Sequence, residues 1–599
     1  MPDLSRILKA DTPLTLAQVA RGAQPLVMAD LARASTGRAV FIAPDDSAMR
    51  AIVDAAAFFA PELEVIEFPA WDSLPYDRAS PALSISARRL SALFRLQAGK
   101  AKAQLVVTTA NAVLQRVLSP FRIRESVREF KPGMEIGRES LGLLLQKQGY
   151  GRTDTVIDKG EYAVRGSIVD IFPSGMDEAL RLDFFGDELE SLRTFDPNTQ
   201  MSTGRLDSHL LLPASEALLD EDSIKRFRSR YREMFGANAT QDPLYEAVSD
   251  GRRLAGMEHW LPLFEEKLAT LFDHLGKDDL IVIDQASIAA ADERVKDISD
   301  YYDQRTAITG QAKGNYRPLK PDALYLTGEE LKKALEAAPA HRTTPFDEPE
   351  SDKVVGFGFR SGRDFAPERA RGDNVYPVLA DHLKSLAKAG KRPLLAAYSK
   401  GSRSRIASIL EEAGTPVQMA ETWQEALGMA AKGKPAAMIL PVEASFANDE
   451  MELLTEQDIL GDRLVRRKKK RKDSDAFLAE LQALSVGDLI VHTEHGIGKY
   501  LGLEPIAVGK SKHDCVQLEY KGGDKLFIPV ENIDVLSRYG SSEEAVMLDR
   551  LGGEAWQKRR ARLKERINEI AGELMQVAAQ RALRKAPVFE IDEGPFNQF

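Results

Sequence analysis

Residues 487–540 read GDLIVHTEHGIGKYLGLEPIAVGKSKHDCVQLEYKGGDKLFIPVENIDVLSRYG, and this stretch decides the fold of its part of the chain. Four short runs are rich in the β-branched, aromatic and aliphatic residues that favour strands: Leu489–His492, Ile497–Leu503, Cys515–Tyr520 and Leu526–Val530. Lys521-Gly522-Gly523-Asp524 predicts a hairpin turn, because glycine permits the positive φ angles that such turns need. A stretch this short can bury only a little apolar surface. We therefore expect a small closed β-barrel with exposed strand edges. Such folds usually bind other macromolecules and perform no chemistry.

The composition is that of an ordinary globular protein. The 599 residues are 43% hydrophobic and 29% charged, a length that predicts roughly four to six domains. No run of about 18 apolar residues occurs, so no membrane span is expected. The single cysteine, Cys515, lies in a predicted strand as a buried thiol; its lack of a disulfide partner fits a cytoplasmic location. The net charge of −10 excludes a chain coated in basic surface, and nothing suggests an obligate dimer.

Apolar patterns divide the first half of the chain into α/β units. Residues 1–122 alternate helices with short apolar strands, among them Ala39–Ala43 and Leu105–Thr108, which predicts buried parallel strands. Residues 123–212 form a β-rich insert, and residues 213–347 return to mixed helix and strand.

A further α/β unit is predicted at 354–460, after an acidic, proline-containing linker at 343–353. Its strand candidates are PLLAAYS at 393–399 and AAMILPV at 436–442, and a helix is expected to end at Gly414. No motif within it points to a function. The predicted barrel then occupies 482–547.

Two basic segments flank the barrel. Seven consecutive basic residues lie in the linker 461–481, and they are either solvated or in non-specific contact with DNA phosphates, since each neutralised phosphate releases counterions. The phosphate-contact candidates are Arg466, Arg467, Lys468, Lys469 and Lys470. In the last unit, 548–599, an apolar stripe predicts a long helix over 554–586 whose first half is basic. A solvated face on a packed helix is the simpler interpretation of those charges.

The order of several sequence motifs resembles one known family. HTEHGIGKYLGL, LEYKGGDKLFIPVENI and LSRYG in the barrel are similar to the RNA-polymerase-interacting domain of bacterial transcription-repair coupling factors and to the first module of CarD-type regulators. WDSLPYDRASP precedes the insert, GEYAVRGSIVDIFPSG and LRLDFFGDELESLRTFD lie within it, and LGGEAW follows the barrel. The resemblance covers essentially all 599 residues.

The resemblance implies a multidomain α/β architecture. The expected order is a UvrB-like α/β module with its β-rich insert, an α/β spacer, a small SH3/Tudor-like (CarD-like) barrel, and a relay helix leading into a DNA-translocating motor. Complete members of the family recognise stalled RNA polymerase, move on double-stranded DNA using ATP and Mg²⁺, displace the polymerase and recruit UvrA. The expectation is that this chain is the amino-terminal adaptor half, a monomer cut before the motor.

Catalytic motifs are missing from the sequence. A phosphate-binding loop needs G-x-x-x-x-G-K-[ST], and the nearest approach, Gly502 to Gly509-Lys510-Ser511, has six intervening residues instead of four. UvrB-like modules carry a nucleotide loop before the strand at Ala39–Ala43, but here residues 24–40 read QPLVMADLARASTGRAV. We therefore predict a degenerate module with no catalytic residue, no ATPase activity and no cofactor of its own. His492 and His495 have no cysteine partner, so no metal site is predicted.

The insert contains the first candidate binding site. Strand alternation in LRLDFFGDELESL places Leu180, Leu182 and Phe184 on one face. Arg181, Asp183 and Phe185 then fall on the other face. An exposed aromatic beside an arginine is a typical binding hot spot, although Phe185 packed under a neighbouring domain is the alternative. The resemblance implies a UvrA-docking surface made of Arg165, Arg181 and Phe185.

The barrel contains the second candidate site. Pro505 interrupts the apolar run 503–508, and because proline is confined to strand edges or bulges, this segment is predicted to lie on an exposed edge. Such an edge can accept a partner strand. The resemblance places the contact with the RNA polymerase β subunit here, with Ile506 as the apolar anchor beside Leu503 and Pro505. A core position for Ile506 is the alternative.

Two other functions compete with the coupling-factor interpretation. A non-enzymatic CarD-type transcription regulator would use the barrel alone, and the long UvrB-like front argues against it. An active UvrB-type helicase would need the phosphate loop that the sequence lacks.

Overall fold

The computed structural model describes residues 4–77, 79–98, 103–173, 175–176, 178–197, 199–309, 316–461, 487, 489–492, 495–508, 511–529, 536–538, 548–551 and 556. The basic run 466–472 and nearly all of the predicted helix 554–586 lie outside this range. Within the range, none of the helices has the length and apolar character needed to cross a membrane.

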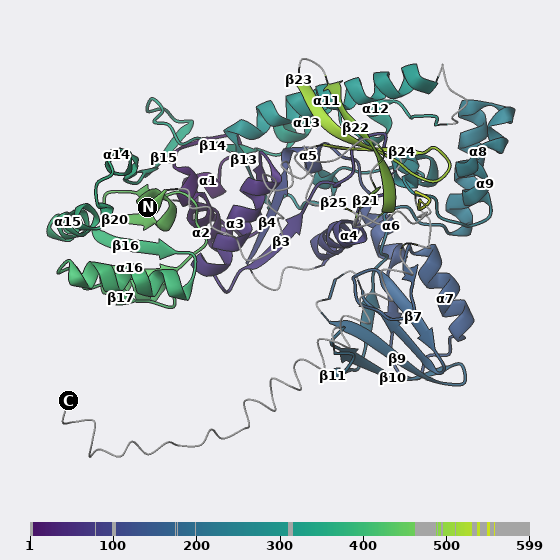
Figure 1. Cartoon of the computed structure of the whole chain (residues 1–599), viewed down its shortest axis with the longest axis horizontal. Helices are drawn as coiled ribbons and strands as arrows, with labels where there is room; N and C mark the ends of the chain where they lie inside the picture. Colours follow the sequence, from purple (N-terminus) through teal and green to yellow (C-terminus); the bar gives the residue numbers. More distant parts are fainter. Residues whose placement is uncertain are drawn as a thin grey trace.

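A twelve-stranded sheet is the largest sheet of the described structure (Figure 1). Its strand order is β17-β18-β16-β20-β19-β15-β1-β14-β13-β2-β4-β3. In chain order the bounds are β1 Thr15–Val19, β2 Ala39–Ala43, β3 Glu64–Phe68, β4 Gln104–Thr109, β13 Leu280–Asp284, β14 His341–Thr343, β15 Val354–Ser361, β16 Arg392–Ala397, β17 Gln418–Met419, β18 Ala436–Ile439, β19 Phe446–Ala447 and β20 Met451–Thr455. The predicted strands β2 and β4 are confirmed: they pair in parallel and are buried throughout, as continuous apolar runs should be.

Helices cover both faces of this sheet. In the first α/β unit they are α1 Ser5–Leu8, η1 Arg21–Ala23, α2 Gln24–Ala34, α3 Asp46–Phe59, α4 Leu83–Gln97, α5 Ala110–Val113 and α6 Pro120–Ser126. After the insert come α8 Glu221–Phe235, η2 Ala237–Gln241, α9 Pro243–Ser249, η3 Met257–Trp260, α10 Leu261–Phe264, η4 Leu271–His274, α11 Gln285–Thr309, α12 Pro321–Leu324 and α13 Gly328–Ala337. The later unit contributes α14 Ala366–Ala370, α15 Val375–Lys388, α16 Lys400–Glu412, α17 Trp423–Ala430 and α18 Glu456–Leu460. The helix predicted to end at Gly414 is α16, and that glycine has the positive φ of +70° expected just past a helix end.

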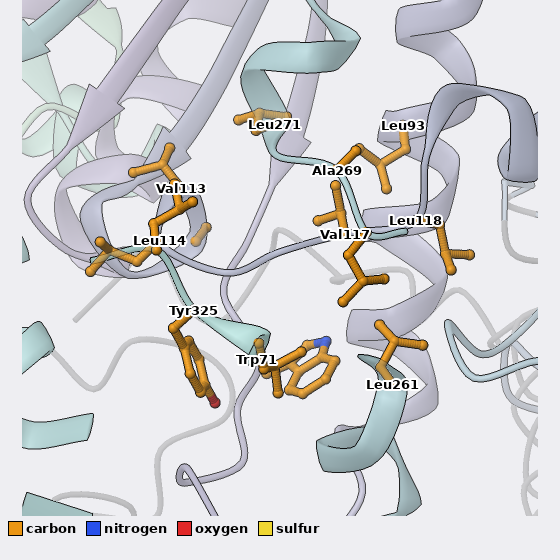
Figure 2. Packing of buried hydrophobic residues seen from close by; sticks show 14 of the residues in the cluster. Trp71, Leu93, Val113, Leu114, Val117, Leu118, Leu261, Ala269, Leu271 and Tyr325 are labelled. Carbon is orange, nitrogen blue, oxygen red and sulfur yellow. The ribbon is translucent and has the colours of Figure 1, made fainter. Parts of the chain in front are cut away.

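Two apolar clusters hold the first half together on opposite faces of the sheet. One packs α2 and α3 against the strands and continues to Trp423 of α17. The other lies under α4, α10 and α11, and Figure 2 shows Trp71 between Tyr325 and Leu261 within it. Burial of these side chains is the main stabilising contribution, at roughly 25 cal/mol per Å² of apolar surface.

The stretch 343–353, predicted as a linker, runs along β1. Thr15 pairs with Arg342 of β14 on one side and with Val354 of β15 on the other. The Gln18 N–H donates to the Phe346 carbonyl at 2.9 Å, which ties the intervening segment to the same strand. The units at 1–347 and 354–460 therefore share one sheet.

The β-rich insert stands apart from this sheet with a core of its own (Figure 1). Its six strands are ordered β11-β10-β9-β8-β7-β6, and α7 Arg138–Lys147 contributes Leu141 and Leu145 to its core. The bounds are β6 Gly151–Arg152, β7 Glu161–Arg165, β8 Ile168–Ile171, β9 Ala179–Phe185, β10 Glu188–Phe195 and β11 Ser202–Leu206. A two-stranded pair, β5 Arg128–Phe130 with β12 His209–Leu211, brings the start and end of the insert together.

The stretch 487–540 contains a five-stranded antiparallel sheet, ordered β24-β23-β22-β21-β25. The bounds are β21 Leu489–His492, β22 Gly496–Val508, β23 Ser511–Glu519, β24 Lys525–Pro529 and β25 Leu536–Arg538. The four predicted strands are confirmed, and Gly522 and Gly523 turn the hairpin with φ angles of +102° and +84°. Cys515 is buried in β23, as predicted.

Candidate protein-binding sites

The alternation predicted for β9 is confirmed. Leu180, Leu182 and Phe184 are buried in the core of the insert. Phe185, on the opposite face, is 80% exposed. The outer face of the six-stranded sheet therefore presents an aromatic ring to solvent.

One buried carboxylate holds both predicted arginines on this outer face. Asp170 of β8 is 1% exposed, and its Oδ1 accepts from Arg181 Nε at 2.8 Å. Its Oδ2 accepts from Arg181 Nη2 and from Arg165 Nη2, each at 3.0 Å. The hydrogen bond to Asp170 raises the pKa of Arg181 above its usual range. Asp170 therefore holds both guanidinium groups in defined positions.

Gln200 closes the arrangement from the turn between β10 and β11. Its Oε1 accepts from Arg165 Nη2 at 3.1 Å, and its backbone carbonyl accepts from Arg181 Nη1 at 3.3 Å. The guanidinium of Arg181 also lies 4.5 Å from the ring centroid of Phe195, within cation–π range. The Gln200 amide group itself donates to the carbonyls of Val156 and Pro197, so it is fixed in turn.

Sequence reasoning named Arg165, Arg181 and Phe185 as candidates but did not name Asp170 or Gln200, which the structure places in contact with the two arginines. Asp170 occupies an otherwise apolar strand, IVDI, and a charged residue in such a strand signals a buried ion pair. The partner could not be read from the sequence, because it depends on the register that sets Asp170 opposite Arg181. No sequence pattern pointed to Gln200. Its φ of +60° is rare for a residue other than glycine, so the turn conformation could not be expected from the residue type.

The second candidate site lies on β22. Leu503 is 50% exposed, and residues 503–508 pair with β23 along one side only, because β21 pairs with β22 only over 496–499. In the register, Pro505 lies opposite Asp514 and Ile506 opposite His513. The side chains of residues 505–508 lie outside the described part of the structure, and the predicted anchor Ile506 is placed by its backbone alone.

His492 and His495 stack on one another, with ring centroids 4.4 Å apart. Burial lowers the pKa of His492 well below its usual range and that of His495 to about 4. Nowhere in the described ranges do three or more His, Cys, Asp or Glu side chains gather as metal ligands.

The segment that precedes β2, where a UvrB-like module would carry its nucleotide loop, is packed against the later α/β unit. It leaves β1 through η1 and enters α2 with Pro25 in the first turn. A Cβ on Gly22 would overlap the carbonyl oxygen of Ala444, so the two backbones lie in close contact. Gln24 donates to Asp284 at 2.5 Å across the end of β13.

Two regions match known domain families. Residues 129–216 match the UvrB interaction domain, and residues 484–540 match the CarD-like/TRCF RID domain. These matches fall on the six-stranded and five-stranded sheets, respectively.

Curated relatives extend the similarity to nearly the whole chain. It is 31% identical over 596 residues to the transcription-repair-coupling factor of Haemophilus influenzae, covering 98% of this chain and 50% of that protein. The protein of the same name from Escherichia coli K12 is 30% identical over 601 residues, with coverages of 99% and 51%. The Bacillus subtilis protein is 25% identical over 571 residues, with coverages of 89% and 46%. This chain therefore belongs to the family of bacterial transcription-repair-coupling factors, and it spans about half the length of the curated relatives it matches.

Proposed function

We propose that this chain acts in transcription-coupled DNA repair as an adaptor, binding UvrA through the six-stranded sheet and RNA polymerase through the five-stranded sheet. The observation that carries the proposal is the exposed ring of Phe185 on the same face of the sheet as two anchored arginines, in a unit that matches the UvrB interaction domain. Aromatic and arginine side chains dominate the binding energy of most protein interfaces.

The UvrA contact is tested with substitutions on the outer face. Phe185→Ala removes a solvent-exposed ring, so we expect UvrA affinity to fall by at least tenfold, or about 1.4 kcal/mol, with an unchanged melting temperature. Leu143→Ala is the matched control, since Leu143 is also exposed in the insert but lies on α7. Isothermal titration calorimetry with purified UvrA would refute the contact if Phe185→Ala and the control bound equally well.

For the polymerase contact, we propose that residues 482–547 form a closed SH3/Tudor-like barrel whose free edge at 503–508 receives the β subunit. Support comes from the one-sided pairing of this segment and from the match to the CarD-like/TRCF RID domain. A strand added there would gain main-chain hydrogen bonds, while Leu503 and Ile506 would supply apolar contacts.

Ile506→Arg tests the polymerase contact. We expect it to abolish micromolar binding to bacterial RNA polymerase, because an arginine at the anchor would be desolvated without a partner. Lys525→Glu, on β24 at the far edge of the sheet, is the control. Polymerase binding without any UvrA binding would instead favour the CarD-type regulator.

ATP turnover, Mg²⁺ and movement on double-stranded DNA are proposed to belong to the motor of complete family members. This chain lacks the G-x-x-x-x-G-K-[ST] loop that nucleotide phosphates require. We expect no ATP hydrolysis above a buffer blank. In complete members a carboxy-terminal domain is proposed to mask the UvrA-docking face, so this chain should bind UvrA more tightly than a complete relative does.

A further inference from the structure

We infer that Asp170 is the positioning residue of the UvrA-docking face, holding Arg165 and Arg181 in their binding geometry with the help of Gln200. The inference rests on the proposed function and extends it to residues that do not themselves touch the partner. Asp170 is too deeply buried for direct contact, so it acts through the two arginines.

The register of the sheet places Asp170 between its partners. Ala163 of β7, Asp170 of β8 and Arg181 of β9 lie directly opposite one another across three adjacent strands. Arg165 extends from the end of β7 and reaches the same carboxylate. A carboxylate with two oxygens can hold one arginine side-on and still accept from a second. Asp170 does this, so it couples the two cations.

Burying this carboxylate would be costly without both partners. An isolated buried charge loses its hydration, and it is retained only where ion pairs and hydrogen bonds replace the water. On the same face, Asp183 holds Arg193 in a separate pair and also accepts from Ser191 at 2.9 Å. Asp183 also acts on Arg181 through its charge, but Asp170 is the carboxylate that hydrogen-bonds both Arg165 and Arg181, so Asp183→Asn serves as a control that removes a charge from the same face and leaves those hydrogen bonds in place.

Positioning the arginines before binding affects affinity directly. Arginine side chains have many rotamers, and ordering them at the moment of association weakens binding. Here Asp170, Gln200 and the Phe195 ring order Arg181 in advance, while Arg165 remains 45% exposed and able to reach a partner. The complementary surface on UvrA should therefore present carboxylates at fixed spacing beside an apolar recess for Phe185.

A double-mutant cycle tests this role in the whole chain. Asp170→Asn keeps the shape of the side chain but removes its charge, and we expect it to weaken UvrA binding at least fivefold. In the Arg165→Ala background the same substitution should have an effect at least twofold smaller, because part of its action has already been removed. Asp183→Asn should have the same effect in both backgrounds. An Asp170→Asn effect that is equally large in both backgrounds would overturn the inference.

A second measurement works without UvrA. In ¹⁵N-arginine-labelled chain, the Nε–H group of Arg181 should be rigid, and Asp170→Asn should increase its picosecond-to-nanosecond motion. Gln200→Gly tolerates the positive φ and removes the hydrogen bond from Arg165 to the Gln200 side chain, so the Nε–H group of Arg165, read in the same spectrum, should lose order in this variant should Asp170→Asn fail to fold. Unchanged relaxation in both variants would overturn the inference. If ordering is lost as expected but the unsubstituted chain does not bind UvrA, the proposed function fails while the positioning role remains.

Discussion

At the scale of single residues, one buried carboxylate ties the end of the insert to the first α/β unit. Glu216 accepts from Trp71 Nε1 and from Arg89 Nε, each at 2.7 Å. Both charged side chains are fully buried, and the Arg89 guanidinium also lies 4.4 Å from the centroid of the Phe68 ring. This network therefore fixes where the chain returns to the first α/β unit after the insert.

Breaking that network should be costly. Glu216→Ala leaves Arg89 as a buried charge without its carboxylate, and we expect the free energy of unfolding to fall by about 3–5 kcal/mol. Glu62→Ala is the control: Glu62 pairs with Arg33 but is 56% exposed, so its loss should remain below about 1 kcal/mol. Denaturant titration followed by tryptophan fluorescence measures both values, and equal losses would contradict the prediction.

His341 should make the fold sensitive to acid. Its Nδ1 accepts the Leu14 N–H at 3.1 Å, and burial lowers its pKa from 6.5 to about 4. Between these values the unfolded chain binds a proton that the folded chain does not, so stability is full above pH 6.5 and is lost as pH falls toward 4. His341→Gln keeps an acceptor but cannot titrate. Urea unfolding at several pH values should therefore show that the free energy of unfolding of this variant depends less steeply on pH, by the equivalent of about one proton. The same slope in the variant and the unsubstituted chain would contradict this.

At the scale of elements, a close backbone contact decides whether replacing glycine by alanine stabilises or destabilises the fold. Gly22→Ala would drive a methyl group into the Ala444 carbonyl, and we expect a loss of about 1–3 kcal/mol. Gly142→Ala, within α7, meets nothing within 4 Å and should stabilise the helix by about 0.5–1 kcal/mol. Thermal unfolding of the two variants tests the contrast in sign, and a shift in the same direction for both would contradict it.

Much of the element inventory could be predicted from the sequence. Alternation placed the two faces of β9 correctly, and the continuous apolar run of β2 identified a buried parallel strand. Strand order could not be predicted: β1 lies between β14 and β15, and no local pattern records a neighbour over 300 residues away. For the same reason the face of β9 on which Arg181 lies was predictable, while its carboxylate partner Asp170 on β8 was not.

At the scale of the whole molecule, the twelve-stranded sheet joins the α/β units at 1–347 and 354–460. Phe359 of β15 is fully buried and meets Phe446 of β19 edge-on, with ring centroids 5.6 Å apart. Its cluster also contains Leu26 of α2 and Trp423 of α17. We therefore expect the two units to unfold together, and the insert, with its separate core, to unfold independently.

Phe359→Ala tests this cooperativity, because it should destabilise the shared core by about 3–5 kcal/mol. Hydrogen exchange followed by mass spectrometry should show faster exchange in both α2 and α17, with β9 of the insert unchanged. Faster exchange in only one of the two helices would show that the sheet does not couple the units.

The contact between Gly22 and Ala444 also has a consequence for descent. A phosphate loop at this position would need a longer segment after β1. Because the Ala444 segment lies directly against Gly22, that segment would also have to move. Either change alone sacrifices packing, and a protein of marginal stability tolerates few such losses. The contact is therefore an evolutionary constraint: substitutions on the outer faces of the molecule leave this corner intact, whereas residues inserted between β1 and α2 would disrupt it.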